Sequence, residues 1–206
     1  MIFSFNNTAT AQKLDSKEIN RLNKIAQQVT IIRDTWGIAH IYGKTDSDAV
    51  FGMLYAQCED DFKRVELNYI EKLGRLSEIN GEKDLFNDLQ IRLLIDSTEA
   101  IADYQKAQPW LKKLLNAYAD GINFYLHKHP EVKPLMLTHF EPWFPLLWTD
   151  GSIGAISTAD LTNEELKSFY GNDDKYAYVE KVKDIQTGSN GFAIAPSKTA
   201  SGNAIL

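Results

Sequence analysis

The stretch from Asp46 to about Lys72 constrains the fold more than any other part of the sequence. Apolar side chains recur in it at spacings of three, four and eight residues, which places them on one stripe of an α-helix. The stripe comprises Val50, Met53, Leu54, Phe62, Val65 and Tyr69. Asp46 is expected as the N-cap, and Gly74 suits the left-handed position after a helix end. The pattern predicts one long helix.

The residues before this helix predict a β-hairpin. Residues 29–33 are rich in β-branched side chains, residues 34–37 are typical of a turn, and residues 38–42 again favour a strand. Residues 13–28 indicate either a short polar helix or a mobile lead-in.

Further helices are expected after residue 96. Residues 97–107 indicate one that ends before Pro109, and residues 110–127 indicate another. The apolar face of the second comprises Leu111, Leu114, Leu115, Tyr118, Ile122 and Tyr125. Residues 162–165 have the capping-box pattern and predict a helix through Phe169.

Other segments are less regular. Residues 139–152 are rich in Trp, Phe and Pro and predict no regular element. Helical character is expected again over residues 174–183. Residues 192–195 predict a buried strand, and residues 203–206 begin another strand that stops after its apolar residues. We therefore expect the chain to be truncated.

Composition limits the classes of function. The chain has 206 residues, 44% of them hydrophobic and 24% charged, as in a globular domain with a sizeable core. Its net charge of −6 and scattered Lys and Arg argue against a nucleic-acid partner. No stretch approaches the roughly 20 apolar residues of a membrane span.

The cysteine and the histidines give no site. Cys58 is the only cysteine, and we interpret it as a packed thiol, because no histidine is placed to activate it. The four histidines lack the spacing of a zinc site and are interpreted as surface or capping residues. They are His40, His127, His129 and His139.

The amino terminus resembles part of an export signal. A short apolar run over residues 1–5 precedes Ala9-Thr10-Ala11, and small residues at the first and third positions suit signal peptidase. We interpret residues 1–11 as a signal-peptide remnant, with a mature start at Gln12 and a periplasmic or secreted location. The alternative is a disordered polar leader.

Gly188-Ser189-Asn190-Gly191 is the remaining candidate for chemistry. A serine hydroxyl needs an adjacent base, and cleavage of the bond before Ser189 would supply one as its own α-amino group. The ordinary pKa of such a group, about 7.7–8.0, suits proton exchange near neutral pH. Gly188 leaves the scissile carbonyl unobstructed and tolerates unusual backbone angles. Taken alone, the motif is also an ordinary turn.

Five blocks, in order, resemble the penicillin acylase family, which includes penicillin, cephalosporin and acyl-homoserine lactone acylases. Residues 32–41 are similar to its Arg-Asp-x-x-Gly-x-x-His-Ile opening, and residues 51–60 to its next helix. Residues 73–78 resemble its Gly-Arg-x-x-Glu element, and residues 117–123 its Tyr-Ala-x-Gly-x-Asn. Residues 189–206 resemble the start of its β-chain. We interpret the landmarks Arg33, Asp34, Gly37 and His40 as structural.

The resemblance implies an α+β chain, the amino-terminal part of a four-layer N-terminal-nucleophile fold, mainly helical with a few strands. It implies an α-chain region with its linker over residues 12–188, cleavage between Gly188 and Ser189, and the start of the β-chain over residues 189–206. Calcium is expected as a cofactor, with most ligands in the β-chain, which also supplies the oxyanion Asn. Residues 148–156 are expected to contribute to the acyl pocket.

The predicted function is that of an amide hydrolase precursor that acts on a small-molecule amide such as a penicillin or an acyl-homoserine lactone. Ser189 is its nucleophile, the β-chain of the same precursor is its partner, and the 206-residue form is expected to be inactive. The alternative is a non-catalytic α-chain fragment that binds or assembles with a separate β-chain.

Overall fold

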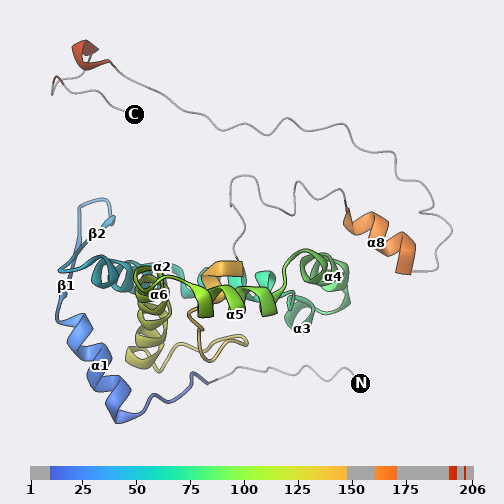
Figure 1. Cartoon of the computed structure of the whole chain (residues 1–206), viewed down its shortest axis with the longest axis horizontal. Coiled ribbons are helices and arrows are strands. Elements are labelled where there is room, and N and C mark those ends of the chain that lie inside the picture. Colours follow the sequence, from blue (N-terminus) through green and yellow to red (C-terminus); the bar gives the residue numbers. More distant parts are fainter. Residues whose placement is uncertain (1–9, 148–160, 171–194, 199–201, 203–206) are drawn as a thin grey trace.

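The computed structural model describes residues 10–147, 161–170, 195–198 and 202. Its elements, in chain order, are α1 (Ser16–Ala26), β1 (Val29–Arg33), β2 (Ala39–Gly43), α2 (Asp46–Lys72), α3 (Ser77–Asn80), α4 (Leu85–Leu94), α5 (Ser97–Lys106), α6 (Pro109–Lys128) and α8 (Asn163–Tyr170). Short 3₁₀ turns are η1 (Glu82–Asp84), η2 (Phe144–Leu147) and η4 (Pro196–Lys198). The β-hairpin and α8 lie at opposite ends of the molecule (Figure 1).

The predicted hairpin is confirmed. β1 and β2 pair antiparallel, with Val29 opposite Gly43, Ile31 opposite Ile41 and Arg33 opposite Ala39. They are the two strands of the sheet found in the described part of the chain. The sheet packs against α2, which begins three residues after β2 ends.

The predicted long helix is confirmed, with two corrections. Its N-cap is Thr45 and not Asp46, because the Thr45 hydroxyl accepts from the Asp48 N–H while the Asp48 carboxylate accepts from the Thr45 N–H. The backbone also leaves the helical region at Asp61, where the side chain accepts from the Arg64 N–H and so caps the second part of α2.

The core lies where α2 meets α6, and the two predicted apolar stripes supply much of it. Leu54, Phe62 and Tyr69 of α2 are buried, but Met53 is 40% exposed and does not belong to the buried face. On α6, Leu115, Ile122 and Tyr125 are buried. The segment after α6 covers this helix pair with Leu137, Phe140, Phe144 and Leu147.

The residues between α2 and α5 form helices that the sequence patterns did not indicate. The buried Asp88 of α4 accepts from the N–H groups of Leu76 and Ser77, at 2.8 and 2.7 Å, and so satisfies the start of α3. Gly74 and Gly81 have positive φ angles of 61° and 82°, which allow the tight connections there.

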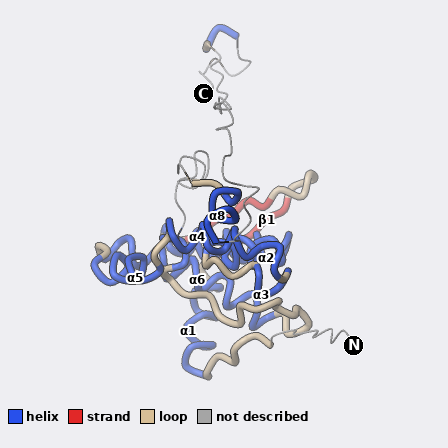
Figure 2. The backbone as a smooth tube through the Cα atoms, turned by 90° about the vertical axis from the view of Figure 1, so that its right-hand side faces the viewer, coloured by secondary structure: helices blue, strands red, loops and turns tan. Residues whose placement is uncertain are grey.

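The other predicted helices are also present. α1 forms over part of the polar segment 13–28, α5 ends at Lys106, and α8 begins with the expected capping box between Thr162 and Glu165. Figure 2 views the molecule from the end where α8 packs beside α4. The helix expected over residues 174–183, residues 192–194 of one expected strand and residues 203–206 of the other lie outside the described residues. Ala195 is described, and it is exposed and belongs to no strand, contrary to its predicted place in a buried strand.

Candidate functional site

The predicted nucleophile and processing residues, Ser189 and Gly188, lie outside the described residues. Residues 148–156, which were expected near the acyl pocket, lie outside them too. The four sequence blocks upstream of these residues are all described. The structure therefore shows what the landmark residues of those blocks do.

Asp34 closes the hairpin turn. Its Oδ1 accepts from the N–H groups of Trp36 and Ile38, at 2.8 and 3.0 Å, and its Oδ2 lies 3.1 Å from Nε2 of His40. The hydrogen bond to His40 lowers the pKa of Asp34, and the two backbone donors lower it further. Gly37 has a φ of 81°, which the turn requires.

Arg33 fastens the hairpin to α2. Its guanidinium donates to the Gly37 carbonyl at 3.0 Å and forms ion pairs with Glu59 and Asp60 at 3.1 and 2.8 Å. The hydrogen bond to Glu59 is the main reason that the pKa of Arg33 is raised. Two members of the acidic run Glu59-Asp60-Asp61 on α2 therefore hold the hairpin by ion pairs.

The hydrogen bonds and ion pairs of this polar cluster stabilise the hairpin and its packing on α2. Among the described residues, no serine, threonine or cysteine side chain hydrogen-bonds to His40, so the imidazole activates none of them. Both oxygens of Asp34 have partners, Oδ1 in the turn amides and Oδ2 in His40 of β2. The structural interpretation of Arg33, Asp34, Gly37 and His40 fits this geometry.

Two glycines in the next blocks allow close packing. A Cβ on Gly52 would lie 2.6 Å from Cγ1 of Val29 and 2.8 Å from Cγ2 of Ile41, so the hairpin can rest on α2 only because this side chain is absent. A Cβ on Gly121 would overlap the carbonyl oxygen of Phe51, where α6 crosses α2.

The Gly-Arg-x-x-Glu block is a connection between helices. Arg75 forms a bidentate pair with Glu78, with N–O distances of 2.7 and 2.8 Å. Arg92 of α4 donates to the carbonyl of Gly74 at 2.9 Å. The block therefore joins α2 to α3 and α4.

Two buried polar side chains hold the segment after α6. Asn123, the last residue of the fourth block, exchanges hydrogen bonds with the backbone of Phe140. Glu66, which is 1% exposed, accepts from the N–H groups of Leu135, Met136 and Leu137 at 2.7–2.9 Å. Sequence reasoning missed Glu66. Its one signal is an acidic residue beside the apolar stripe of α2.

Cys58 is a packed thiol, as predicted. It is 1% exposed, and burial raises the pKa of its thiol to about 12, so little thiolate forms at neutral pH.

Of the histidines on α6 and beyond, His129 pairs with Glu131 at 3.0 Å and approaches the Tyr55 hydroxyl at 3.3 Å. Within the described ranges, no group of three or more His, Cys, Asp or Glu side chains could hold a metal ion.

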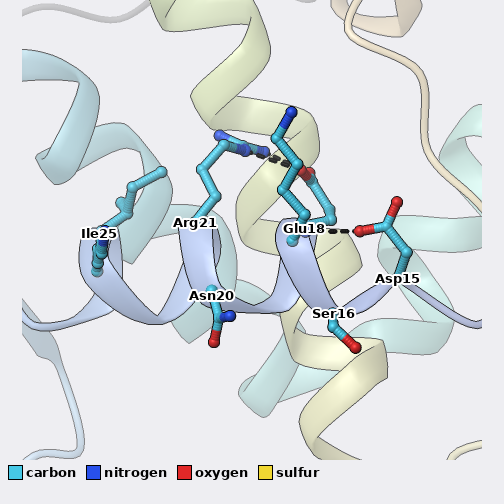
Figure 3. A pocket seen from close by; sticks show the side chains of 8 residues that line it. Asp15, Ser16, Glu18, Asn20, Arg21 and Ile25 are labelled. Atoms are coloured by element: carbon cyan, nitrogen blue, oxygen red, sulfur yellow. Dashed lines mark hydrogen bonds and ion pairs between the residues drawn. The ribbon is translucent and has the colours of Figure 1, made fainter.

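Two hollows lie away from the hairpin. Figure 3 shows one of about 940 Å³ along α1, whose lining residues all come from that helix and its N-cap. Its Arg21 is already paired with Glu18 and with Asp120 of α6. A second, of about 370 Å³, lies beside the Tyr69 hydroxyl, which donates to the Tyr118 hydroxyl at 2.5 Å. Neither hollow places a general base beside a nucleophilic side chain.

The chain is similar to known proteins over most of its length. The family model described as penicillin amidase matches residues 28–206. The chain is 28% identical over 116 residues to acyl-homoserine lactone acylase QuiP of Pseudomonas putida, covering 56% of this chain and 14% of that protein. It is 28% identical over 124 residues to penicillin acylase 2 proenzyme of Pseudomonas sp. strain SE83, covering 59% and 16%. This chain thus spans a small part of the length of these relatives.

The fold has a solved counterpart. Thermostable penicillin G acylase from Alcaligenes faecalis matches with a TM-score of 0.56 and 16% identity, over 80% of this chain and 98% of the matched chain. The expected fold class is confirmed by this match, as is the mainly helical character of the fragment. None of the described helices is long and apolar enough to cross a membrane.

Proposed function

Because the chain belongs to the penicillin amidase family, we propose that it is the α-chain region of an amide hydrolase precursor that is cut between Gly188 and Ser189. The observation that carries the proposal is the family match over residues 28–206, which includes the Gly-Ser motif. The substrate is an acyl amide, since relatives bear the names acyl-homoserine lactone acylase and penicillin acylase.

The chemistry begins with a free Ser189. Its Oγ attacks the amide carbonyl carbon, and its α-amino group accepts the hydroxyl proton, directly or through water. The carbon–nitrogen bond then breaks, the proton passes to the leaving amine, and an acyl ester remains on Ser189. Water attacks this ester by the reverse proton path and releases the carboxylic acid.

The described residues serve this chemistry by holding the fold. The pair formed by Asp34 and His40 fixes the hairpin turn, Arg33 fixes the hairpin on α2, and Asn123 fixes the chain after α6. No oxyanion donor is assigned to them. In this proposal the oxyanion donors come from the β-chain, a second polypeptide of the same precursor, and calcium binds to ligands outside the described residues.

Turnover tests the proposal. The full-length acylase should release acid from penicillin G or an acyl-homoserine lactone, and the matched Ser189→Ala variant should not. The 206-residue chain alone should show no turnover above that control, because loss of even one oxyanion donor costs about 100- to 1,000-fold in rate. An active full-length Ser189→Ala variant would show that Ser189 is not the nucleophile.

Export belongs to the same proposal. The motif Ala9-Thr10-Ala11 favours removal of a leader and a periplasmic or secreted enzyme. Amino-terminal sequencing of the exported protein should find Gln12 or a neighbour as the first residue, and an intact Met1 on a cytosolic protein would contradict it.

A further inference from the structure

Tyr55 of α2, His129 at the end of α6 and Glu131 in the segment that follows are joined by hydrogen bonds. Nε2 of His129 lies 3.3 Å from the Tyr55 hydroxyl, and its Nδ1 lies 3.0 Å from Oε1 of Glu131. A carboxylate can only accept, so in the neutral imidazole Nδ1 carries the hydrogen and donates it to Glu131. Nε2 then has a lone pair, which accepts from the Tyr55 hydroxyl.

The imidazole of His129 is held by its neighbours. His129 is the C-cap of α6, and its backbone N–H donates to the Tyr125 carbonyl at 2.9 Å. The Tyr125 ring lies against the imidazole, with the two centroids 4.4 Å apart, and the Tyr55 ring packs near both. A nucleophile beside a base that a third group orients is the arrangement on which nucleophilic catalysis depends.

The Tyr55 phenol needs such a base in order to react. Tyr55 is half-buried, and burial raises the pKa of its hydroxyl, with Glu59 and Cys58 raising it further. Little phenolate therefore forms near neutral pH, and the proton has to leave as the oxygen attacks. Nε2 of His129 is within reach of that proton.

An apolar cavity lies beside the Tyr55 side chain. Its volume is about 270 Å³, and its lining comes from α1, β1, α2 and α6, with the rings of Phe51 and Phe124 among it. Of the described residues that line it, Tyr55 is the one with a polar side chain. A cavity of this kind suits a short apolar chain next to the group that reacts with the phenol.

We propose that Tyr55 is an acyl-acceptor site: His129 is the general base for its hydroxyl, Glu131 positions the imidazole, and the cavity takes the apolar chain of the acyl group. The donor is an acyl compound with a good leaving group. The Tyr55 oxygen attacks the carbonyl carbon while its proton passes to Nε2 of His129. The bond to the leaving group then breaks, the leaving group takes the proton from His129, and the acyl group remains as an ester on Tyr55. Ser189 takes no part, so the inference is independent of the proposed function.

Acylation of the full-length protein by N-acetylimidazole, followed by peptide mass spectrometry, is the direct test. Trypsin releases Tyr55 in the peptide of residues 45–63, which has no other tyrosine. Free N-acetyltyrosinamide in the same solution is the reference, because its phenol is fully exposed and has no base beside it. Tyr55 should be acetylated about 10-fold faster than the reference or more, although it is half-buried. An equal or slower rate at Tyr55 would overturn the inference.

Histidine variants distinguish a base from a packing residue. His129→Ala should lower the Tyr55 rate by about 10-fold or more, whereas a packing role predicts a faster reaction, because loss of the imidazole exposes the phenol. An unchanged or higher rate would therefore overturn the role of His129. His127→Ala, in the last turn of α6, is the matched control and should leave the Tyr55 rate unchanged. Should His129→Ala fail to fold, the comparison of the wild type with the free phenol still decides.

Glu131→Gln keeps the size of the side chain and removes its charge. It should lower the Tyr55 rate by less than His129→Ala does, because Glu131 is 69% exposed, and an unchanged rate would contradict its positioning role.

Two further measurements locate the acyl group and test the cavity. Tyr55→Phe should abolish the mass gain of the peptide of residues 45–63, and an unchanged gain would show that another side chain reacts. With N-butyrylimidazole, the rate at Tyr55 relative to the reference should rise by about threefold or more over the acetyl reagent, because two more methylene groups leave water. An equal ratio for the two reagents would overturn the role of the cavity.

Discussion

Asn123 and Phe140 exchange two hydrogen bonds in the core: the Asn123 side-chain amide donates to the Phe140 carbonyl at 2.8 Å, and its oxygen accepts from the Phe140 N–H at 2.9 Å. Asn123→Ala leaves both backbone groups buried without a partner. We expect the free energy of unfolding to fall by about 1–3 kcal/mol, which urea denaturation measures.

Asn116→Ala is the matched control on the same helix. The Asn116 side chain is exposed and accepts one hydrogen bond from the Tyr104 hydroxyl. Its replacement should change the unfolding free energy by no more than about 0.5 kcal/mol. An equal loss in both variants would mean that the pairing with Phe140 is not what stabilises this part of the core.

Glu66 should be the most sensitive acidic residue of α2. Glu66→Gln keeps the size of the side chain but places an NH₂ group against backbone N–H groups of Leu135, Met136 and Leu137. We expect a loss of about 1–3 kcal/mol in unfolding free energy, with faster exchange of the Met136 and Leu137 amides. The exposed Glu82→Gln serves as control, and a similar loss there would contradict the assignment.

Gly121→Ala tests the close contact between α6 and α2. Helix propensity alone predicts that alanine stabilises a helix interior by roughly 1 kcal/mol relative to glycine. The added Cβ would overlap the Phe51 carbonyl oxygen, so we expect destabilisation by about 1–3 kcal/mol instead. Thermal unfolding gives the sign directly, and a higher melting temperature would show that the helices separate without cost.

Periodicity and turn chemistry were sufficient for the elements whose signals are local. The hairpin, the apolar stripes and the cap at Thr162 follow from neighbours in the sequence. α3 and α4 were missed because the start of α3 is stabilised by Asp88, a residue 11 positions after Ser77. Glu66 was missed for the same reason, since its partners are about 70 residues away. The role of Ser189 was inferred from the resemblance to the penicillin acylase family. Because Ser189 lies outside the described residues, the structure gives no distance that tests this role.

The turn around Asp34 should respond to acid. The pKa of Asp34 is held below its ordinary value of 3.8, chiefly by the hydrogen bond to His40. Because the pKa is lowered on folding, its contribution to stability is complete above the ordinary value and is lost as the pH falls through the lower folded value. The Trp36 and Ile38 amide resonances should therefore titrate with a midpoint below 3.8. Asp34→Asn should abolish this titration, and a midpoint above the ordinary value would contradict the assigned hydrogen bonds.

The central claim is that Ser189 both cuts the precursor and hydrolyses the substrate. Intact-mass spectrometry of the full-length precursor tests it most directly, with Ser189→Ala and Ser189→Cys measured beside the wild type. We expect two chains from the wild type, with the second beginning at Ser189, and one uncut chain from Ser189→Ala. Ser189→Cys should still be cut, because a thiol can attack the Gly188 carbonyl, but should hydrolyse substrate more slowly. Two chains from Ser189→Ala, with the second beginning at residue 189, would show that another protease makes the cut and would contradict the claim.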